Sequence, residues 1–210
     1  MKAILVNGSP KQEGSTNGAL RVVAENLQRQ GIETDIHWIG NKPMQCCIGC
    51  NACRRKDGTG GCAIASDVNE FAQKMELADA LIVGSPVYFA NCAGALSGWL
   101  DRLFYAHSHK FRGKLASSVA VCRRGGGTAT IDQMNKYFGF AEMPIVSSQY
   151  WNVIHGNHPD EIKQDAEGMQ ILKVLADNMS FLLQCLDAGK KAGIQMPPKD
   201  KRQWTNFIRN

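Results

Sequence analysis

Short apolar runs alternate along the chain with longer segments of helical periodicity. The runs end in turn residues: Val6 is followed by Asn-Gly-Ser-Pro, and Gly84 is followed by Ser-Pro. Apolar runs that are bounded in this way are typical of buried strands. The predicted strands are 2–6, 32–39, 80–84, 116–122 and 143–147.

The segments between these runs carry apolar residues three and four positions apart. In the first of them, Leu20, Val23 and Leu27 lie on one helix face, and Gly31 is a usual C-terminal stop. Asp67 followed by Glu70 resembles a capping box at the start of the second helix. The predicted helices are 17–30, 67–76, 96–105, 130–138 and 160–186.

Five strands that alternate with helices predict a doubly wound α/β sheet with right-handed crossovers. Such sheets bind ligands at the carboxyl ends of their strands, where the polar loops after the first, third and fourth strands should converge. The length of 210 residues suits one domain. We assign 1–188 to that domain and 189–210, which is rich in Pro and Lys, to an extended C-terminal arm.

The loop after the first strand predicts an anion site. Its hydroxyl groups, its backbone N–H groups and the positive end of the following helix suit a phosphate. It lacks the Gly-Lys-Ser/Thr of a Walker loop, and an ordinary helix cap formed by Ser-Thr-Asn is the alternative explanation. The candidate ligands are Ser9, Lys11, Ser15, Thr16 and Asn17.

The two later loops suit a flat aromatic ring. The loop after the third strand offers aromatic faces and backbone groups, and the loop after the fourth offers guanidinium and glycine N–H donors to an electron-rich ring edge. Core aromatics and a solvated basic turn are the alternatives. The candidate residues are Pro86, Val87, Tyr88 and Phe89 in the second loop and Arg123, Arg124, Gly125 and Gly126 in the third.

Five of the eight cysteines fall between residues 46 and 62. Cys47, Cys50, Cys53 and Cys62 have the pattern C-x2-C-x2-C-x8-C, whose four thiolates suit an iron–sulfur cluster or a tetrahedral zinc ion. A loop of plain reduced thiols is the third possibility. The remaining cysteines that lie in apolar contexts are predicted core residues: Cys92, Cys122 and Cys185.

Composition and charge limit the classes of binding partner that we expect. The net charge of +5 is modest and the basic residues are spread along the chain, so no nucleic-acid partner is expected. No apolar stretch reaches about 18 residues, so we expect no membrane partner. The apolar start is too short for a signal peptide, which favours a cytoplasmic location.

Over residues 1–155 the chain resembles the NAD(P)H-dependent FMN reductase family, near its iron–sulfur flavoprotein branch. The resemblance implies a flavodoxin-like five-stranded parallel sheet of order 2-1-3-4-5, with a Cys-rich loop after strand 2. It also implies that the first loop holds the FMN phosphate, that the other two loops hold the isoalloxazine, and that the cysteines hold a possible [4Fe-4S] cluster. The matching stretches are 8–11, 14–17, 84–89, 101–102 and 123–127.

Two functions follow from this resemblance. In the first, NAD(P)H reduces bound FMN, which passes electrons to a quinone, a flavin or another small-molecule acceptor. In the second, FMN and a cluster relay electrons between protein partners. Asp101 and Arg102 are expected to form a helix ion pair or helix-end contact rather than to act in catalysis. Trp204, Phe207 and Ile208 in the arm favour a homodimer or homotetramer, with an arm that folds back on its own domain as the alternative.

Overall fold

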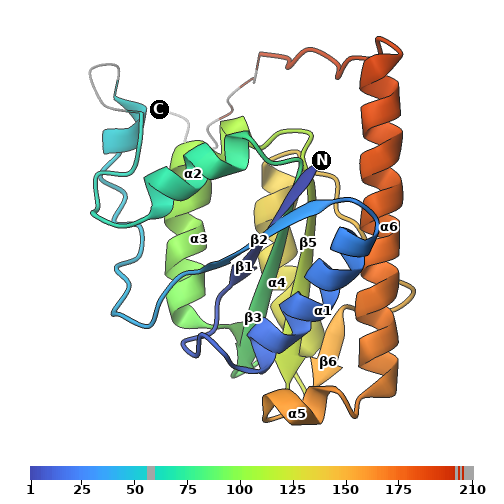
Figure 1. Cartoon of the computed structure of the whole chain (residues 1–210). Coiled ribbons are helices and arrows are strands. Elements are labelled where there is room, and N and C mark those ends of the chain that lie inside the picture. The colour runs from blue at the N-terminus through green and yellow to red at the C-terminus, as the bar shows by residue number, and fades with distance from the viewer. Residues whose placement is uncertain (56–59, 202, 204, 206–210) are drawn as a thin grey trace.

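The computed structural model describes residues 1–55, 60–201, 203 and 205, and its centre is a parallel sheet (Figure 1). The five parallel strands have the order β2-β1-β3-β5-β6, and the short β4 pairs antiparallel with β3. This confirms the predicted order, because β5 and β6 are the fourth and fifth parallel strands. The bounds are β1 Lys2–Asn7, β2 Glu33–Trp38, β3 Ala80–Tyr88, β4 Asn91–Cys92, β5 Leu115–Cys122 and β6 Val153–His155.

Helices cover both faces of the sheet (Figure 1). One face carries α1 and α6, and the other carries α2, α3 and α4. The helices are α1 Ser15–Arg29, α2 Val68–Glu76, α3 Gly94–His107, α4 Gly127–Phe140, α5 Pro159–Ile162 and α6 Ala166–Lys191, with 3-10 turns η1 Ala52–Arg54 and η2 Ser108–Lys110.

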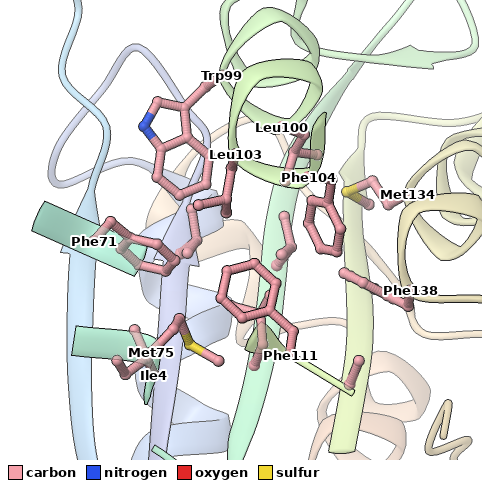
Figure 2. Packing of buried hydrophobic residues seen from close by; sticks show 14 of the residues in the cluster. Ile4, Phe71, Met75, Trp99, Leu100, Leu103, Phe104, Phe111, Met134 and Phe138 are labelled. Atoms are coloured by element: carbon pink, nitrogen blue, oxygen red, sulfur yellow. The ribbon is translucent and has the colours of Figure 1, made fainter. Parts of the chain in front are cut away.

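The two hydrophobic cores follow from the alternation of side chains along the strands. Ile4 and Val6 of β1 pack on the side of α2, α3 and α4, whereas Ala3 and Leu5 pack against α1 and α6. Both sets are fully buried, as expected for a central parallel strand covered on both faces. Figure 2 shows the first core, where aromatic rings from α2, α3 and α4 meet.

The fifth strand is not at the predicted position. Around 143–147 the chain makes one isolated bridge, between Ala116 and Ile145, and regular pairing with β5 begins only at Val153. The buried Ser117 hydroxyl donates to the Val146 carbonyl at 2.8 Å and accepts from Asn152 Nδ2 at 3.0 Å, so a side chain takes the place of further ladder bonds.

The third strand is longer than predicted and continues through Pro86. The last residue of β1 that pairs with β3 is Asn7, opposite Gly84. Beyond that point, among the described strands, β3 has a parallel partner only on the β5 side. A proline without an N–H is tolerated where one edge of the strand has no partner, which is why the sequence punctuation at Pro86 was misleading.

The predicted helix 160–186 is two helices with a break at Asp165. The Asp165 carboxylate accepts the Gly168 N–H at 2.9 Å, which caps α6, and the His155 N–H at 2.7 Å, which ties the cap to β6. Burial alone would raise the pKa of Asp165, but these hydrogen bonds outweigh it and hold the pKa below its ordinary value. Asp165 therefore joins the start of α6 to the edge strand.

Asp67 does not cap α2 with its side chain as predicted. Its carboxylate instead accepts Trp99 Nε1–H at 2.9 Å and His37 Nε2 at 2.7 Å, while the Ser66 hydroxyl accepts the Val68 N–H at 3.3 Å. Burial opposes the charge of Asp67, yet the bonds from His37 and Trp99 lower its pKa below the ordinary value. The Asp67 side chain therefore bonds to residues of β2 and α3 instead of capping its own helix, α2.

The described part of the arm folds back on its own domain. Arg112 donates to the Pro197 carbonyl at 3.0 Å, and Lys199 lies 3.1 Å from the Glu142 carboxylate. Trp204, Phe207 and Ile208, on which the predicted homodimer or homotetramer was based, lie outside the described residues. None of the helices in the described part of the chain combines the length and apolar character that crossing a membrane requires.

We predict that Asp67→Ala lowers the free energy of unfolding by about 1–3 kcal/mol, because it leaves the buried Trp99 Nε1–H without an acceptor. Because the folded-state pKa of Asp67 is depressed, its contribution is present above about pH 4 and is lost as the pH falls further. Urea unfolding of wild type and variant at pH 7 and pH 3 measures both effects. A stability difference that does not shrink at pH 3 would contradict this assignment.

Candidate functional site

The loop after β1 is organised by Asn7, a fully buried residue. Asn7 Oδ1 accepts the Ser9 N–H at 3.0 Å, and Asn7 Nδ2 donates to the Gln12 carbonyl at 3.1 Å. From β2, Trp38 Nε1–H donates to the Ser9 carbonyl at 2.8 Å. These bonds hold the loop without using the side chain of Lys11, which is exposed.

The loop leads into α1, whose N-terminus has no side-chain cap in the described chain. Gly14 is the N-cap, no side chain of the described residues caps the helix with a hydrogen bond, and the first turn contains no acidic residue. This excludes the ordinary cap that was the alternative for Ser15 and Thr16. Free N–H groups and the positive end of the helix dipole remain available to an anion.

A cleft of about 480 Å³ opens at this point, within the usual range for small-molecule sites. It brings together all three predicted loops, because residues of the first loop, the end of β3 and the end of β5 share its wall. The predicted residues that line it are Ser9, Lys11, Ser15, Thr16, Pro86, Val87, Tyr88 and Arg123.

The other predicted residues are not among those lining this cleft in the described chain. The side chain of Asn17 is buried and donates to Glu13 Oε2 at 3.1 Å. Phe89 is fully exposed. Arg124 and Gly125 are exposed. Gly126 brings the third loop against the second: its φ is +88°, and a Cβ there would lie 2.8 Å from Ala90 Cα.

The fourth wall of the cleft, Gly156–Pro159, was not predicted as part of the site. It follows β6, so it lies at the same carboxyl edge as the other loops. The Gly156 N–H donates to the Cys122 carbonyl at 3.0 Å, which fixes the wall beside the third loop. The sequence carries a turn signal here, Gly-Asn after His155. With the fifth strand predicted at 143–147, however, the end of that strand was expected nearer residue 147 than Gly156.

The charge of the cleft is mainly basic. Lys11 and Arg123 line it, while Glu13, the one acidic residue among the described residues that line it, is paired with Arg21 at 2.9 Å. Burial raises the pKa of the Cys122 thiol, which keeps that group neutral. The uncapped helix and these cations suit a phosphorylated ligand.

A second pocket lies beside the C-terminal half of α3, away from the cleft. One pocket is lined by all four predicted metal ligands, Cys47, Cys50, Cys53 and Cys62, together with Arg102 and Tyr105 of α3. Since α3 begins at the strand ends and rises about 1.5 Å per residue, Tyr105 lies roughly 16 Å along the helix from Gly94. The cysteine pocket and the basic cleft are therefore two sites.

Side chains hold the cysteine loop against the body. The Asn69 side chain bonds to both backbone groups of Cys62, accepting its N–H at 2.8 Å and donating to its carbonyl at 2.9 Å. Asn69 also accepts from His107 Nε2 at 2.9 Å, and burial lowers the pKa of His107. Tyr105 donates to Asn51 Oδ1 at 2.7 Å.

The four cysteines of this pocket supply the donors of a metal centre, but their arrangement does not fit one as the loop stands. Among residues 1–55 and 60–201, no three His, Cys, Asp or Glu side chains are arranged to hold one metal ion, as tetrahedral zinc would need. A four-iron cluster takes one thiolate on each iron. The pocket volume of about 20 Å³ is that of a water-sized group, so a cluster needs the loop to stand farther out than it does here.

The cysteines outside this loop differ from one another. Cys92 and Cys122 are buried as predicted, and burial raises the pKa of Cys92 to about 11. Cys185 is exposed, so its prediction as a core residue was wrong. It lies on α6, whose outer face the sequence pattern did not separate from the buried one.

The sheet order defines a flavodoxin-like fold, and the comparisons with known proteins agree. The chain belongs to the NADPH-dependent FMN reductase family, whose sequence pattern it matches over residues 1–158. It is an oxidoreductase of that FMN-binding family.

Individual relatives refine the comparison. An iron–sulfur flavoprotein of Methanocaldococcus jannaschii is 32% identical over 89% of this chain and 99% of its own length. An NADH-dependent FMN reductase of Pseudomonas putida is 29% identical over 48% of this chain and 50% of its own length. A flavodoxin from the domain Archaea shares the fold, with a TM-score of 0.59 at 12% identity over 88% of this chain and 99% of that one.

The hairpin between β3 and β4 carries backbone strain at the mouth of the site. Its two turn residues, Phe89 and Ala90, have φ of 51° and 59°, a left-handed conformation that side chains disfavour. The Phe89 ring is fully exposed, so removing it costs no packing. A two-residue hairpin of the type I′ class needs positive φ at both turn residues, so the β3–β4 pairing imposes this conformation on Phe89 and Ala90.

We therefore expect Phe89→Gly to raise the free energy of unfolding by about 0.5–1 kcal/mol. Asn91→Gly, two residues on at an ordinary φ, is the matched control and should lower stability. Denaturant titrations of both variants measure the change. A loss of stability in Phe89→Gly would show that the turn is not strained in solution.

Proposed function

We propose that this protein is an FMN-dependent oxidoreductase that takes electrons from NAD(P)H and passes them, through bound FMN, to a small acceptor such as a quinone or a flavin. The observation that carries the proposal is the basic cleft, in which the uncapped start of α1 lies opposite the ends of β3 and β5. The family of the chain supports FMN as the ligand of this cleft.

The roles of the residues follow from their positions around the cleft. Lys11, Ser15 and the free N–H groups of α1 would hold the phosphate. Tyr88 offers a ring face, and Arg123 offers donors to the ring edge, where negative charge develops on reduction. When bound, FMN itself supplies the hydride and electron chemistry, so the protein's part is to bind, orient and exclude water.

A relay of electrons between protein partners is the second candidate. The specific observation in its favour is the four-cysteine pocket, together with a relative of nearly full-length coverage that is an iron–sulfur flavoprotein. A cluster at Cys47, Cys50, Cys53 and Cys62 would supply one-electron chemistry at that pocket. A small-molecule acceptor and a cluster are compatible within one chain.

The visible spectrum of anaerobically purified protein, before and after NADPH or NADH, separates the two candidates. We expect flavin bands that bleach on addition of one of the two nucleotides. Rapid bleaching without iron supports the reductase, whereas stoichiometric iron and sulfide with slow bleaching support the relay. A colourless folded protein that takes up no added FMN would contradict both.

We predict that Lys11→Ala weakens FMN binding about tenfold or more, because a charged hydrogen bond to phosphate contributes about 1.5–3 kcal/mol. Riboflavin, which lacks the phosphate, should bind wild type and Lys11→Ala equally. Lys11→Arg should retain FMN binding, since Arg preserves the charge and adds a second donor. Fluorescence titrations measure all three. An equal loss for riboflavin would move Lys11 away from the phosphate.

Assembly and location remain proposals. We propose a homodimer or homotetramer in the cytoplasm; the assembly is supported by exposed aromatic residues such as Tyr150 and Trp151, whose rings meet edge to face at 4.6 Å between centroids.

A further inference from the structure

Helix α6, which runs along one side of the molecule (Figure 1), is apolar on two faces. Its inner face packs into the core through residues such as Met179, which is fully buried. On its outer face Phe181 is 66% exposed, Leu186 40% and Leu182 36%, and Cys185 is exposed as well. A helix that is apolar all round is typical of one that is buried on every side. The outer face therefore calls for a cover that the domain itself does not supply.

The segment before β6 extends this apolar surface. It lies along α6, because Asn178 Nδ2 donates to the Ser147 carbonyl at 2.8 Å. Its large apolar side chains are nevertheless exposed, with fractions of 44% for Ile145, 56% for Tyr150 and 57% for Trp151. Exposed apolar side chains gathered in one region mark a contact with another protein.

A groove continues the surface at the C-terminal end of α6. It has a volume of about 890 Å³, and Cys185 and Leu186 line it from the helix. Pro144 lines it from the segment before β6, and Ile194 and Met196 line it from the arm. Both of these arm residues are themselves more than half exposed. The outer face of α6 thus combines a projecting ring, Phe181, with a hollow beside it.

The order of large and small residues on α6 points to a second copy of this chain as the partner. Residues that are not fully buried recur on one side of the helix at alternating intervals of four and three, the spacing of a helix–helix seam. They are Val174, Asn178, Phe181, Cys185 and Ala188.

This seam complements itself when two copies run antiparallel. If the pair is centred midway between Phe181 and Cys185, each Phe181 ring lies opposite the small Cys185 side chain of the other copy, and each Asn178 lies opposite Ala188. A parallel pair would set ring against ring and Ala188 against Ala188, which leaves one layer overfilled and another empty. A patch that matches itself is what a two-fold dimer requires.

Charge also favours the antiparallel pair over the parallel one. A parallel pair would set Asp177 against Asp177 and Lys191 against Lys191, and like charges in contact repel. In the antiparallel pair, Lys191 lies opposite the stretch between Lys173 and Asp177 of the other copy, so an attraction offsets the repulsion.

We propose that the outer face of α6, together with residues 144–151, is a two-fold homodimer interface in which the α6 helices run antiparallel and Phe181 of each copy packs against Cys185 of the other. The inference rests on the assembly proposed above and names its surface; it does not depend on FMN. Cys185 serves there as a small apolar residue, which is a common use of a free cysteine.

The first test compares two charged substitutions in the full chain. Phe181→Asp should raise the dissociation constant of the dimer about a hundredfold or more, because the two-fold places the change at two central contacts. Leu77→Asp is the matched control: Leu77 is 82% exposed at the end of α2, on the other face of the sheet, and its dimer should be unchanged. Sedimentation velocity over a range of protein concentrations measures both. Since Phe181 is exposed within each copy, circular dichroism should show both variants folded.

The second test examines the register of the pair by cross-linking. Phe181→Cys brings a thiol opposite the native Cys185 of the other copy. Diamide accepts the two electrons and two protons that each pair of thiols loses on forming a disulfide, so oxidation should give a covalent dimer on a non-reducing gel. Adding Cys185→Ser should abolish that product, and wild type treated in the same way gives the background from the other cysteines. A cross-link that persists without Cys185 would overturn the antiparallel register.

The outcomes separate this inference from the other proposals. An oligomer that Phe181→Asp leaves intact would overturn the α6 interface and keep the assembly, which would then use another surface. A wild-type chain that is monomeric at every concentration would overturn both, and its uptake of FMN would still support the reductase.

Discussion

The close approach of β1 and β3 at their carboxyl ends is the constraint on which the site depends. The Gly8 N–H donates to the Gly84 carbonyl at 2.9 Å, and a Cβ on Gly8 would lie 2.4 Å from a methyl carbon of Leu96 on α3. Only glycine permits this contact. It sets the first loop directly against the second and seats both on the beginning of α3, so the anion site at α1 and the end of β3 share one wall.

The same helix connects the two candidate sites. Its first turn receives the hairpin after β3, where the Ala93 N–H donates to the Ser85 hydroxyl at 3.0 Å, and its last turns carry Arg102 and Tyr105 to the cysteine pocket. The inner face of α3 is fixed by Trp99, which is buried against Phe71 and bonded to Asp67 (Figure 2). The placement of both sites thus depends on one well-packed helix.

Sequence reasoning located three of the four loops of the cleft and missed the fourth. Polar residues that follow an apolar run announce the end of a strand, and parallel strands end at a common edge, so Ser9, Tyr88 and Arg123 could be brought together without coordinates. The loop at Gly156 was not predicted as part of the cleft, because the apolar run at 143–147 resembles a strand. In the structure, Ser117 bonds to Val146 and Asn152, and the strand that pairs with β5 begins only at Val153. Asn7 was taken as a turn residue, since its carboxamide bonds become visible only when the loop is folded.

The sequence by itself determined the alternation of strands and helices and the grouping of four cysteines, because these depend on local periodicity and on spacing along the chain, whereas the order of the strands was implied by the resemblance to a known family. Only the tertiary structure decided that Asp67 serves Trp99 and not its own helix, that Asn17 turns inward to Glu13, and that Arg102 lies buried with no carboxylate partner in the described chain. Those outcomes depend on which side chains meet across elements distant in sequence, and burial changes the free energy of a charge far more than its neighbours in the chain do.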